Sequence, residues 1–243
     1  GVGKTELAKA IAAITGHTLT RLQCYEGLDE AKALYEWNYK KQLLRIQADS
    51  GERDWHTVEH DIFTEDFLLS RPLLTAIRSS EPVVLLIDEV DRVEVETEAL
   101  LLEVLSDWQV SIPELGTIIT TRPPFVVLTS NNTRELSEAL KRRCLFLHMG
   151  YPEIEREKQI IRARVPEIDA MFAEQIARVV QSIRAFDLKK APSVSETLDW
   201  ARTLLLLGVE RIDATVTRKT LSVLLKYQPD IEKVSAGLVI KDA

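Results

Sequence analysis

The first five residues could bind the phosphates of a nucleotide. They form the second half of the phosphate-binding pattern G-x-x-x-x-G-K-[ST], and helical periodicity follows them directly. Glycines let backbone N–H groups approach anionic oxygens, and the N-terminus of the following helix adds partial positive charge. In this pattern the lysine contacts the β- and γ-phosphates, and the threonine hydroxyl binds Mg²⁺. The predicted site for ATP and Mg²⁺ comprises Gly1, Val2, Gly3, Lys4 and Thr5.

Two carboxylates stand where a second part of such a site is expected. Residues 83–87 are continuously apolar, as a strand buried on both faces of a parallel sheet is, and Asp88 and Glu89 follow them directly. Ligands bind outside the carboxyl ends of such strands. Asp88 would therefore hold Mg²⁺ through water, and Glu89 would accept a proton from the attacking water or orient it. Taken alone, the first motif could be an ordinary turn, and the second could be two surface carboxylates at the end of a strand. Together the two motifs favour a nucleotide hydrolase.

Polar groups also flank two later apolar runs. Residues 125–129 lead into Asn131 and Asn132, either of which could position a water beside the γ-phosphate, although Asn pairs also form ordinary turns. Arg142 and Arg143 precede a third run. One of them could stabilise transition-state charge on a neighbouring subunit's nucleotide, or both could simply favour the C-terminus of a helix.

Hydrophobic periodicity predicts an α/β half followed by a helical half. In the first half we expect strands at 18–24, 83–87, 125–129 and 144–149, a β-hairpin at 108–120, and helices at 5–15, 29–48, 65–77, 94–106 and 135–142. Residues 51–63 are polar and are expected to be irregular. Gly150-Tyr151-Pro152 marks the domain boundary, beyond which helices are expected at 153–164, 169–183, 195–207 and 215–227.

Composition is that of a soluble globular protein. The chain has 243 residues, 45% of them apolar, and no apolar run approaches the ~20 residues of a membrane helix. A net charge of −7 argues against a nucleic-acid surface. Cys24 and Cys144 lie in apolar stretches, which favours buried, reduced thiols and a cytoplasmic location.

In this order, the four motifs resemble those of the AAA+ ATPases, and the finer pattern resembles the MoxR branch. That branch carries an insert after the second strand, matched here by about 26–63, and a hairpin before the sensor strand, matched by 108–120. The runs Leu86 to Arg92 and Cys144 to Pro152 are also similar to that branch. Within it, the sequence most resembles ATPases encoded with carbon monoxide dehydrogenase and related molybdenum enzymes.

The resemblance implies a P-loop AAA+ parallel sheet sandwiched by helices over residues 1–150 and an all-helical lid over 151–243. The first strand and the opening glycine of the phosphate loop are expected to be missing, because the sequence begins inside the motif. We therefore expect the 243-residue chain by itself to bind ATP poorly and to fold marginally.

The resemblance also assigns roles to individual residues. Asp88 and Glu89 match Walker B, Asn131 matches sensor 1, and Arg143 matches the arginine finger that acts on the adjacent subunit. One position departs from the pattern: Ser195 stands where many MoxR proteins carry the arginine of sensor 2. The coupling of the lid to the nucleotide state is therefore in question.

The function implied is ATP hydrolysis by a ring, expected to be a hexamer, that remodels or matures a client protein. The client would be a molybdenum or copper metalloenzyme, and the partner a von Willebrand A-domain protein. Two other hypotheses remain. A nucleotide-gated scaffold with negligible hydrolysis is favoured by the missing sensor-2 arginine, whereas a DNA-associated AAA+ motor is disfavoured by the acidic balance.

Overall fold

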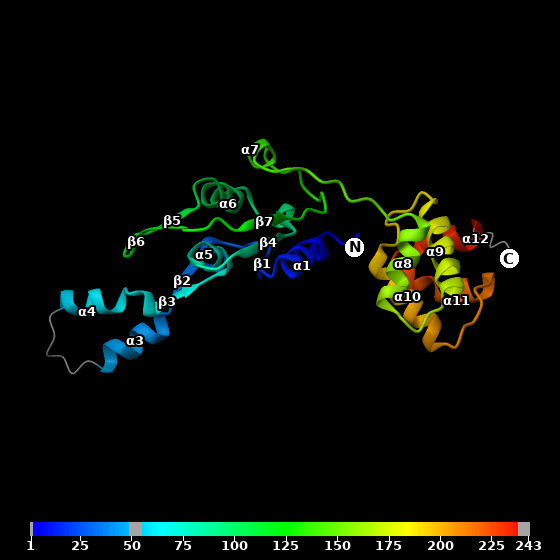
Figure 1. The fold of residues 1–243 in the computed structure, drawn as a ribbon, viewed down its shortest axis with the longest axis horizontal. Helices are drawn as coiled ribbons and strands as arrows, with labels where there is room; N and C mark the ends of the chain where they lie inside the picture. The colour runs from blue at the N-terminus through cyan, green and yellow to red at the C-terminus, as the bar shows by residue number, and fades with distance from the viewer. Residues whose placement is uncertain (1, 49–54, 238–243) are drawn as a thin grey trace. The chain divides into compact units, whose positions relative to one another are not determined.

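The structure is a computed structural model that describes residues 2–48 and 55–237 (Figure 1). Two compact bodies are present. One comprises residues 4–147, and the other begins at His148 and also takes in Val2 and Gly3. The two bodies are described separately.

A parallel sheet forms the centre of the first body. Strands β1 (Thr18–Gln23), β4 (Val83–Asp88) and β7 (Phe125–Leu128) are hydrogen-bonded in the order β1-β4-β7. The register places Gln23 beside Asp88 and Ile87 beside Leu128, so the carboxyl ends of the strands lie at one edge. Every residue of β4 is buried, as the continuous apolar run predicts.

Helices cover both faces of this sheet. Val84 and Leu86 pack against Ala8 and Ala12 of helix α1 (Lys4–Thr15). The alternate residues of β4 join the larger core, to which helices α5 (Pro72–Arg78) and α6 (Val95–Asp107) contribute. Successive side chains of a strand point to opposite faces, so a strand covered on both sides is apolar throughout. The predicted helix-covered parallel sheet is confirmed.

The insert differs from its prediction. The helix expected at 29–48 is instead α2 (Glu30–Ala33), β2 (Tyr35–Trp37) and α3 (Tyr39–Ala48). Strand β2 pairs antiparallel with β3 (Leu68–Ser70), which lies within the stretch at 65–77 that was also expected to be a helix. Trp37 is buried, and its ring meets that of Phe63 edge to face with centroids 5.2 Å apart. Cross-strand pairing and aromatic packing therefore override the local helix preference.

Pro72 divides the stretch expected to be helical at 65–77, because it starts α5, where its missing N–H costs nothing. One further expectation for the insert is wrong. Residues 55–62, expected to be irregular, form helix α4 (Trp55–Ile62). The buried side chain of Gln42 on α3 donates a hydrogen bond to the carbonyl oxygen of Ile62, at 2.9 Å. Tertiary packing of this kind stabilises short helices that are marginal alone.

The hairpin is formed as predicted, by β5 (Gln109–Ile112) and β6 (Gly116–Ile119). Helix α7 (Glu138–Arg142) is shorter than expected. The strand predicted at 144–149 is not formed, and Leu145 and Phe146 are 102% and 90% exposed. No strand within the described residues lies beside this segment, and a single strand cannot pair its backbone polar groups. Cys24 is buried as expected, whereas Cys144 is only half-buried.

The described residues of the second body form helices and connecting loops, with no strand among them. It consists of α8 (Ile154–Arg164), α9 (Ala170–Arg184), α10 (Val194–Leu206), α11 (Ala214–Leu224) and α12 (Gln228–Gly237). The fully buried Trp200 lies in its core and donates from Nε1 to Oγ1 of Thr220 at 2.8 Å. Within the described residues, none of the helices of either body has the length and apolarity needed to cross a membrane.

One ion pair is buried in this second body. The guanidinium of Arg184 on α9 donates to both carboxylate oxygens of Glu157 on α8, at 2.6 and 2.8 Å. Their side chains are 7% and 1% exposed. The hydroxyl of Thr197 on α10 also donates to Glu157, at 2.9 Å. Three helices are therefore joined through one carboxylate.

Candidate nucleotide site

The start of α1 meets the end of β4 at one edge of the sheet. Thr5, in the first turn of α1, donates its hydroxyl proton toward the carboxylate of Asp88, with Oγ1 3.1 and 3.2 Å from the two oxygens. Gly3 precedes the helix with φ of +99°, a conformation that favours glycine. Gly1 lies outside the described residues. Val2, which precedes Gly3, has no assigned helical or strand conformation. The predicted residues Thr5 and Asp88 are thus in direct contact.

Asp88 is almost fully buried and accepts hydrogen bonds from three elements. Besides Thr5, the hydroxyl of Thr129 donates to Oδ1 at 2.5 Å, and Nη2 of Arg21 donates to Oδ2 at 2.5 Å. Burial by itself raises the pKa of Asp88, but the hydrogen bonds from Thr129, Arg21 and Thr5 outweigh it and hold that pKa below its ordinary value. The carboxylate is therefore ionised and oriented at neutral pH.

Lys4 and the loop after β7 are linked. The ammonium of Lys4 donates to the carbonyl oxygen of Ser130 at 2.5 Å and to Oδ1 of Asn131 at 2.8 Å. Nδ2 of Asn131 in turn donates to Oε1 of Glu89 at 3.3 Å. Asn132, the other candidate, is exposed, and its backbone N–H donates to the Ser130 hydroxyl. The geometry favours Asn131 as the residue that would meet a γ-phosphate.

Glu89 has an unusual backbone conformation. Its φ and ψ are 58° and 47°, in the left-handed region that a non-glycine residue rarely occupies. The backbone N–H of Glu89 donates to the Thr129 hydroxyl at 2.9 Å, and its carboxylate forms an ion pair with Arg92 at 2.8 Å. Such strained conformations persist only where the surrounding structure enforces them, and they cluster at functional sites. The side chain of Glu89 contacts Asn131 and Arg92, and so has other partners than the side chain of Asp88.

Asp91 belongs to this site although the sequence analysis did not select it. It is 3% exposed, and its carboxylate accepts hydrogen bonds from the backbone N–H of Asn131, at 3.1 Å, and from the N–H and hydroxyl of Thr133, at 2.8 and 2.6 Å. Burial opposes these bonds, yet they hold the pKa of Asp91 below its ordinary value. Asp91 therefore fixes the loop that carries Asn131. A third carboxylate within the run that contains Asp88 was the available signal.

Replacing Asp91 with Asn should lower ATP turnover by roughly tenfold, because a displaced Asn131 no longer orients the water. We expect the affinity for ATP to stay within about twofold of the wild type, because Asp91 does not contact the predicted phosphate site. Steady-state kinetics and binding of a fluorescent nucleotide measure the two effects. Asp107→Asn, at an exposed position at the end of α6, is the matched control. Equal turnover in the two variants would show that the loop does not depend on Asp91.

The remaining predicted residues lie elsewhere. Arg143 follows α7, exposed, and its guanidinium donates to the carbonyl oxygen of Ala139 at 3.1 Å. Arg142 is exposed on the same helix. Ser195 is exposed in the first turn of α10, in the other body, and its backbone N–H donates to the Ser193 hydroxyl. The roles of Arg143 and of sensor 2 stay predictions.

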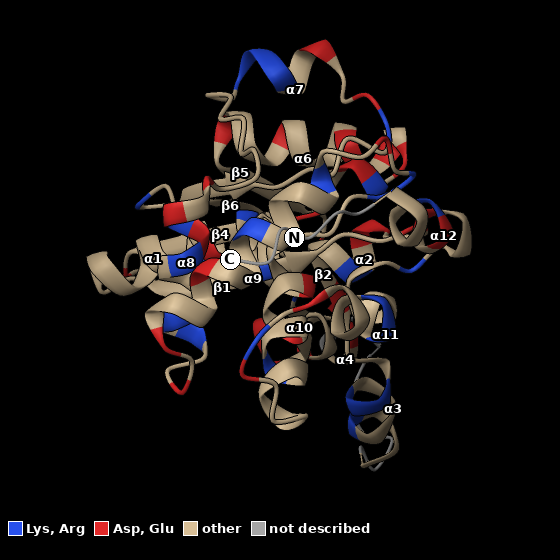
Figure 2. Ribbon diagram, turned by 90° about the vertical axis from the view of Figure 1, so that its right-hand side faces the viewer, with Lys and Arg blue, Asp and Glu red and all other residues tan. Residues whose placement is uncertain are grey.

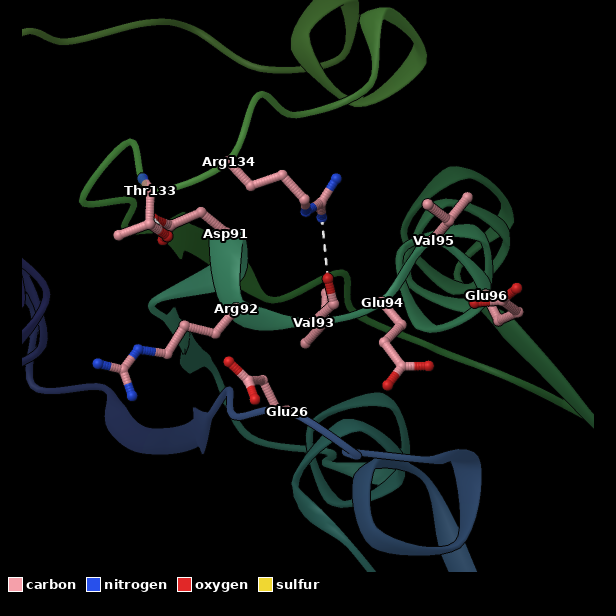
Figure 3. Close-up of a pocket in the computed structure, with 9 residues that line it drawn as sticks. All are labelled: Glu26, Asp91, Arg92, Val93, Glu94, Val95, Glu96, Thr133 and Arg134. Carbon is pink, nitrogen blue, oxygen red and sulfur yellow. Dashed lines mark hydrogen bonds between the residues drawn. The ribbon is translucent and has the colours of Figure 1, made fainter.

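One hollow of the first body is distinct from the phosphate site. It has a volume of about 690 Å³ and borders Asp91 and Thr133 (Figure 3). Its other lining residues include three glutamates, and Arg134 donates across one wall to the carbonyl oxygen of Val93 at 3.0 Å. Lys4, Thr5 and Asp88 do not line it. An acidic hollow of this kind suits no phosphate, so the site is assigned to the edge of the sheet.

Residues 1–144 match the family model described as "AAA domain (dynein-related subfamily)". This chain belongs to the AAA family. The relationship implied by the motifs is thus confirmed at the level of the family. Among curated relatives, the gas vesicle ATPase GvpN of Haloferax mediterranei is 26% identical over 196 residues, which are 76% of this chain and 54% of GvpN.

The uncharacterized protein YeaC of Bacillus subtilis is 28% identical over 176 residues, covering 61% of this chain and 53% of YeaC. This AAA chain thus spans about half the length of both relatives. The RuvB Holliday junction branch migration motor of Thermotoga maritima is a structural neighbour, with 19% identity and a TM-score of 0.47. That match covers 91% of this chain and 58% of RuvB.

The AAA site contains oxygen ligands suited to Mg²⁺. The hydroxyl of Thr5 and the carboxylate of Asp88 converge from different elements, and hydroxyl, carboxylate and water oxygens are what Mg²⁺ prefers. Among the described residues, no group of three or more His, Cys, Asp or Glu side chains could hold a metal. Mg²⁺ usually enters with substrate phosphates and uses few protein ligands rather than an all-protein cage.

Proposed function

We propose that this protein binds ATP with Mg²⁺ at Lys4, Thr5 and Asp88 and hydrolyses it. The observation that carries the proposal is the hydrogen-bonded series from Lys4 through Asn131 to Glu89, directly beside the Thr5–Asp88 pair. In this arrangement the ammonium of Lys4 would bind phosphate, and the Asn131 amide and the Glu89 carboxylate would bind the attacking water. The oxygens of Thr5 and Asp88 would bind the cation.

In the proposed mechanism, Lys4 exchanges its contacts with Ser130 and Asn131 for phosphate oxygens. The released amide of Asn131 then orients a water, and Glu89 accepts its proton. The backbone conformation of Glu89 and its bond with Asn131 keep the two groups together. Mg²⁺ would supply charge neutralisation between the phosphates. Gly1, Val2 and Gly3 would contribute the backbone N–H groups.

We further propose that the protein acts as a ring of MoxR type, with Arg143 completing the site of the adjacent subunit. An exposed arginine at the end of a short helix is free to meet another subunit. The hexamer, the von Willebrand A-domain partner and the chaperone-like remodelling of a molybdenum or copper enzyme rest on the resemblance to MoxR proteins. The name of GvpN offers a second class of client, a gas vesicle assembly.

A scaffold that binds ATP without hydrolysing it is the alternative that Ser195 favours, since no arginine stands at that position of α10. A DNA motor finds less support. Figure 2 shows Lys and Arg interspersed with Asp and Glu along most elements, with basic residues predominating on α3. Nucleic-acid surfaces normally gather positive charge more widely.

Mixing two inactive variants of the intact protein tests both hydrolysis and the ring. Arg143→Ala keeps a complete site without its finger, and Glu89→Gln keeps the finger without a working site. Since a ring places each finger on a neighbour's site, an equal mixture should regain roughly a quarter of wild-type turnover. Each variant alone is measured in parallel. The matched control is a mixture in which Arg142→Ala takes the place of Arg143→Ala. A mixture as inactive as its components would contradict the trans-acting role of Arg143.

A further inference from the structure

Arg21 is the charged partner of Asp88. It lies on β1, in the neighbouring strand, and its Nη2 donates to Oδ2 of Asp88 at 2.5 Å as well as to Oε1 of Gln23. The register sets Gln23 beside Asp88, so Arg21 and Gln23, two residues apart, point to the same face of the strand. The pair is asymmetric, because the side chain of Arg21 is 48% exposed and that of Asp88 only 5%.

The other groups that contact the Asp88 carboxylate are neutral. Thr129 and Thr5 donate hydroxyl protons, and neither carries charge. A buried carboxylate is costly unless an opposite charge compensates it. Arg21 provides that compensation. Its long side chain and half-exposed position also allow it to move into water at small cost.

Magnesium would need the same carboxylate. A divalent cation held through water by the carboxylate that Arg21 contacts would face the positive charge of the guanidinium, and like charges repel. Both hydroxyl donors can remain when the cation arrives, whereas the guanidinium cannot keep its position without this repulsion. The occupant that must leave is therefore Arg21.

We propose that Arg21 is a positioning residue that takes the place of magnesium at Asp88 in the nucleotide-free site and withdraws when Mg²⁺ and nucleotide bind. The proposal rests on the proposed magnesium site at Thr5 and Asp88. Arg21 compensates the charge of the carboxylate and fixes its orientation in the absence of the metal. It also competes with the metal, and so sets the concentration of Mg²⁺ at which the nucleotide is held.

The test compares Arg21→Gln with wild type in the intact protein, using a fluorescent, non-hydrolysable ATP analogue titrated with Mg²⁺. The apparent affinity for Mg²⁺ should become roughly fivefold tighter, because the competing cation is gone. In EDTA without nucleotide, the same variant should melt at a lower temperature than wild type, and this difference should vanish in saturating Mg²⁺ and analogue. In protein that carries Asp88→Asn, adding Arg21→Gln should not lower the melting temperature in EDTA. The carboxylate that Arg21 compensates is then gone.

Two variants serve as controls. Arg21→Lys keeps the charge and should restore both the weaker Mg²⁺ affinity and the melting temperature. Arg202→Gln breaks an exposed ion pair with Asp199 in the other body and should change neither quantity.

Unchanged or weaker Mg²⁺ affinity in Arg21→Gln would overturn the proposal, as would a melting difference that persists with Mg²⁺ and analogue. If nucleotide binding in wild type is itself independent of Mg²⁺, the magnesium site fails and the role of Arg21 fails with it. The wild-type titration therefore distinguishes the two failures.

Discussion

Replacing Glu89 with Gln should lower ATP turnover at least about a hundredfold while ATP affinity stays within about threefold of wild type. The amide has nearly the same shape and its oxygen can still accept from Asn131, but its NH₂ group cannot accept from Arg92, and the side chain cannot accept a proton from water. Because Lys4, Thr5 and Asp88 are untouched, binding of the nucleotide should persist. Steady-state phosphate release measures the first effect, and equilibrium binding of a fluorescent ATP analogue measures the second.

Glu96→Gln is the matched control for this variant, since Glu96 is exposed in the first turn of α6. It should keep wild-type turnover. Glu89→Gln turning over ATP as fast as Glu96→Gln would remove Glu89 from the mechanism. A wild type that binds ATP tightly but releases no phosphate would instead favour the scaffold.

Replacing Glu157 with Ala should destabilise the second body by about 3–5 kcal/mol. The variant leaves the guanidinium of Arg184 buried at 7% exposure without its carboxylate, and the Thr197 hydroxyl keeps only the carbonyl oxygen of Ser193 as an acceptor. The aromatic ring of Tyr151, 4.4 Å from the Arg184 guanidinium carbon, cannot replace an ion pair. Hydrogen exchange of the backbone amides of α8, α9 and α10 in the intact protein, at increasing urea concentrations, measures the change.

A second substitution separates two causes of destabilisation, the uncompensated charge of Arg184 and the volume lost from the Glu157 side chain. Adding Arg184→Met to Glu157→Ala removes the uncompensated charge and should recover part of the stability. Asp199→Ala, at an exposed ion pair on α10, should have little effect. If Glu157→Ala is as stable as Asp199→Ala, the buried pair contributes nothing, and the three helices are held by their apolar core alone.

The sequence predicted best those elements whose environment is uniform. Residues 83–87 are apolar at every position, and only a strand covered on both faces requires that. The insert was predicted poorly because its structure depends on distant partners. Tyr35–Trp37 becomes a strand only by pairing with Leu68–Ser70, and no local pattern shows this. The run at 144–149 shows the converse, since a good strand pattern without a neighbour within the described residues forms no strand.

The same distinction applies to the site. Lys4, Thr5, Asp88, Glu89 and Asn131 were selected because each follows a phosphate pattern or the end of an apolar run, and the structure brings them together. Arg21, Asp91 and Thr129 were missed. Arg21 occupies a polar position of an alternating strand, which in sequence is indistinguishable from an ordinary surface residue. Its importance depends on the register between β1 and β4, which is a property of the folded sheet.

The left-handed backbone at Glu89 has a consequence for protein engineering. A glutamate in this conformation costs on the order of 1–3 kcal/mol, whereas glycine or asparagine would adopt it more readily. Directed evolution for heat resistance alone would therefore enrich those residues at position 89 and eliminate the proposed proton acceptor. Position 89 is one at which thermostability and catalysis select opposite residues, so any stabilised variant must be screened for turnover as well.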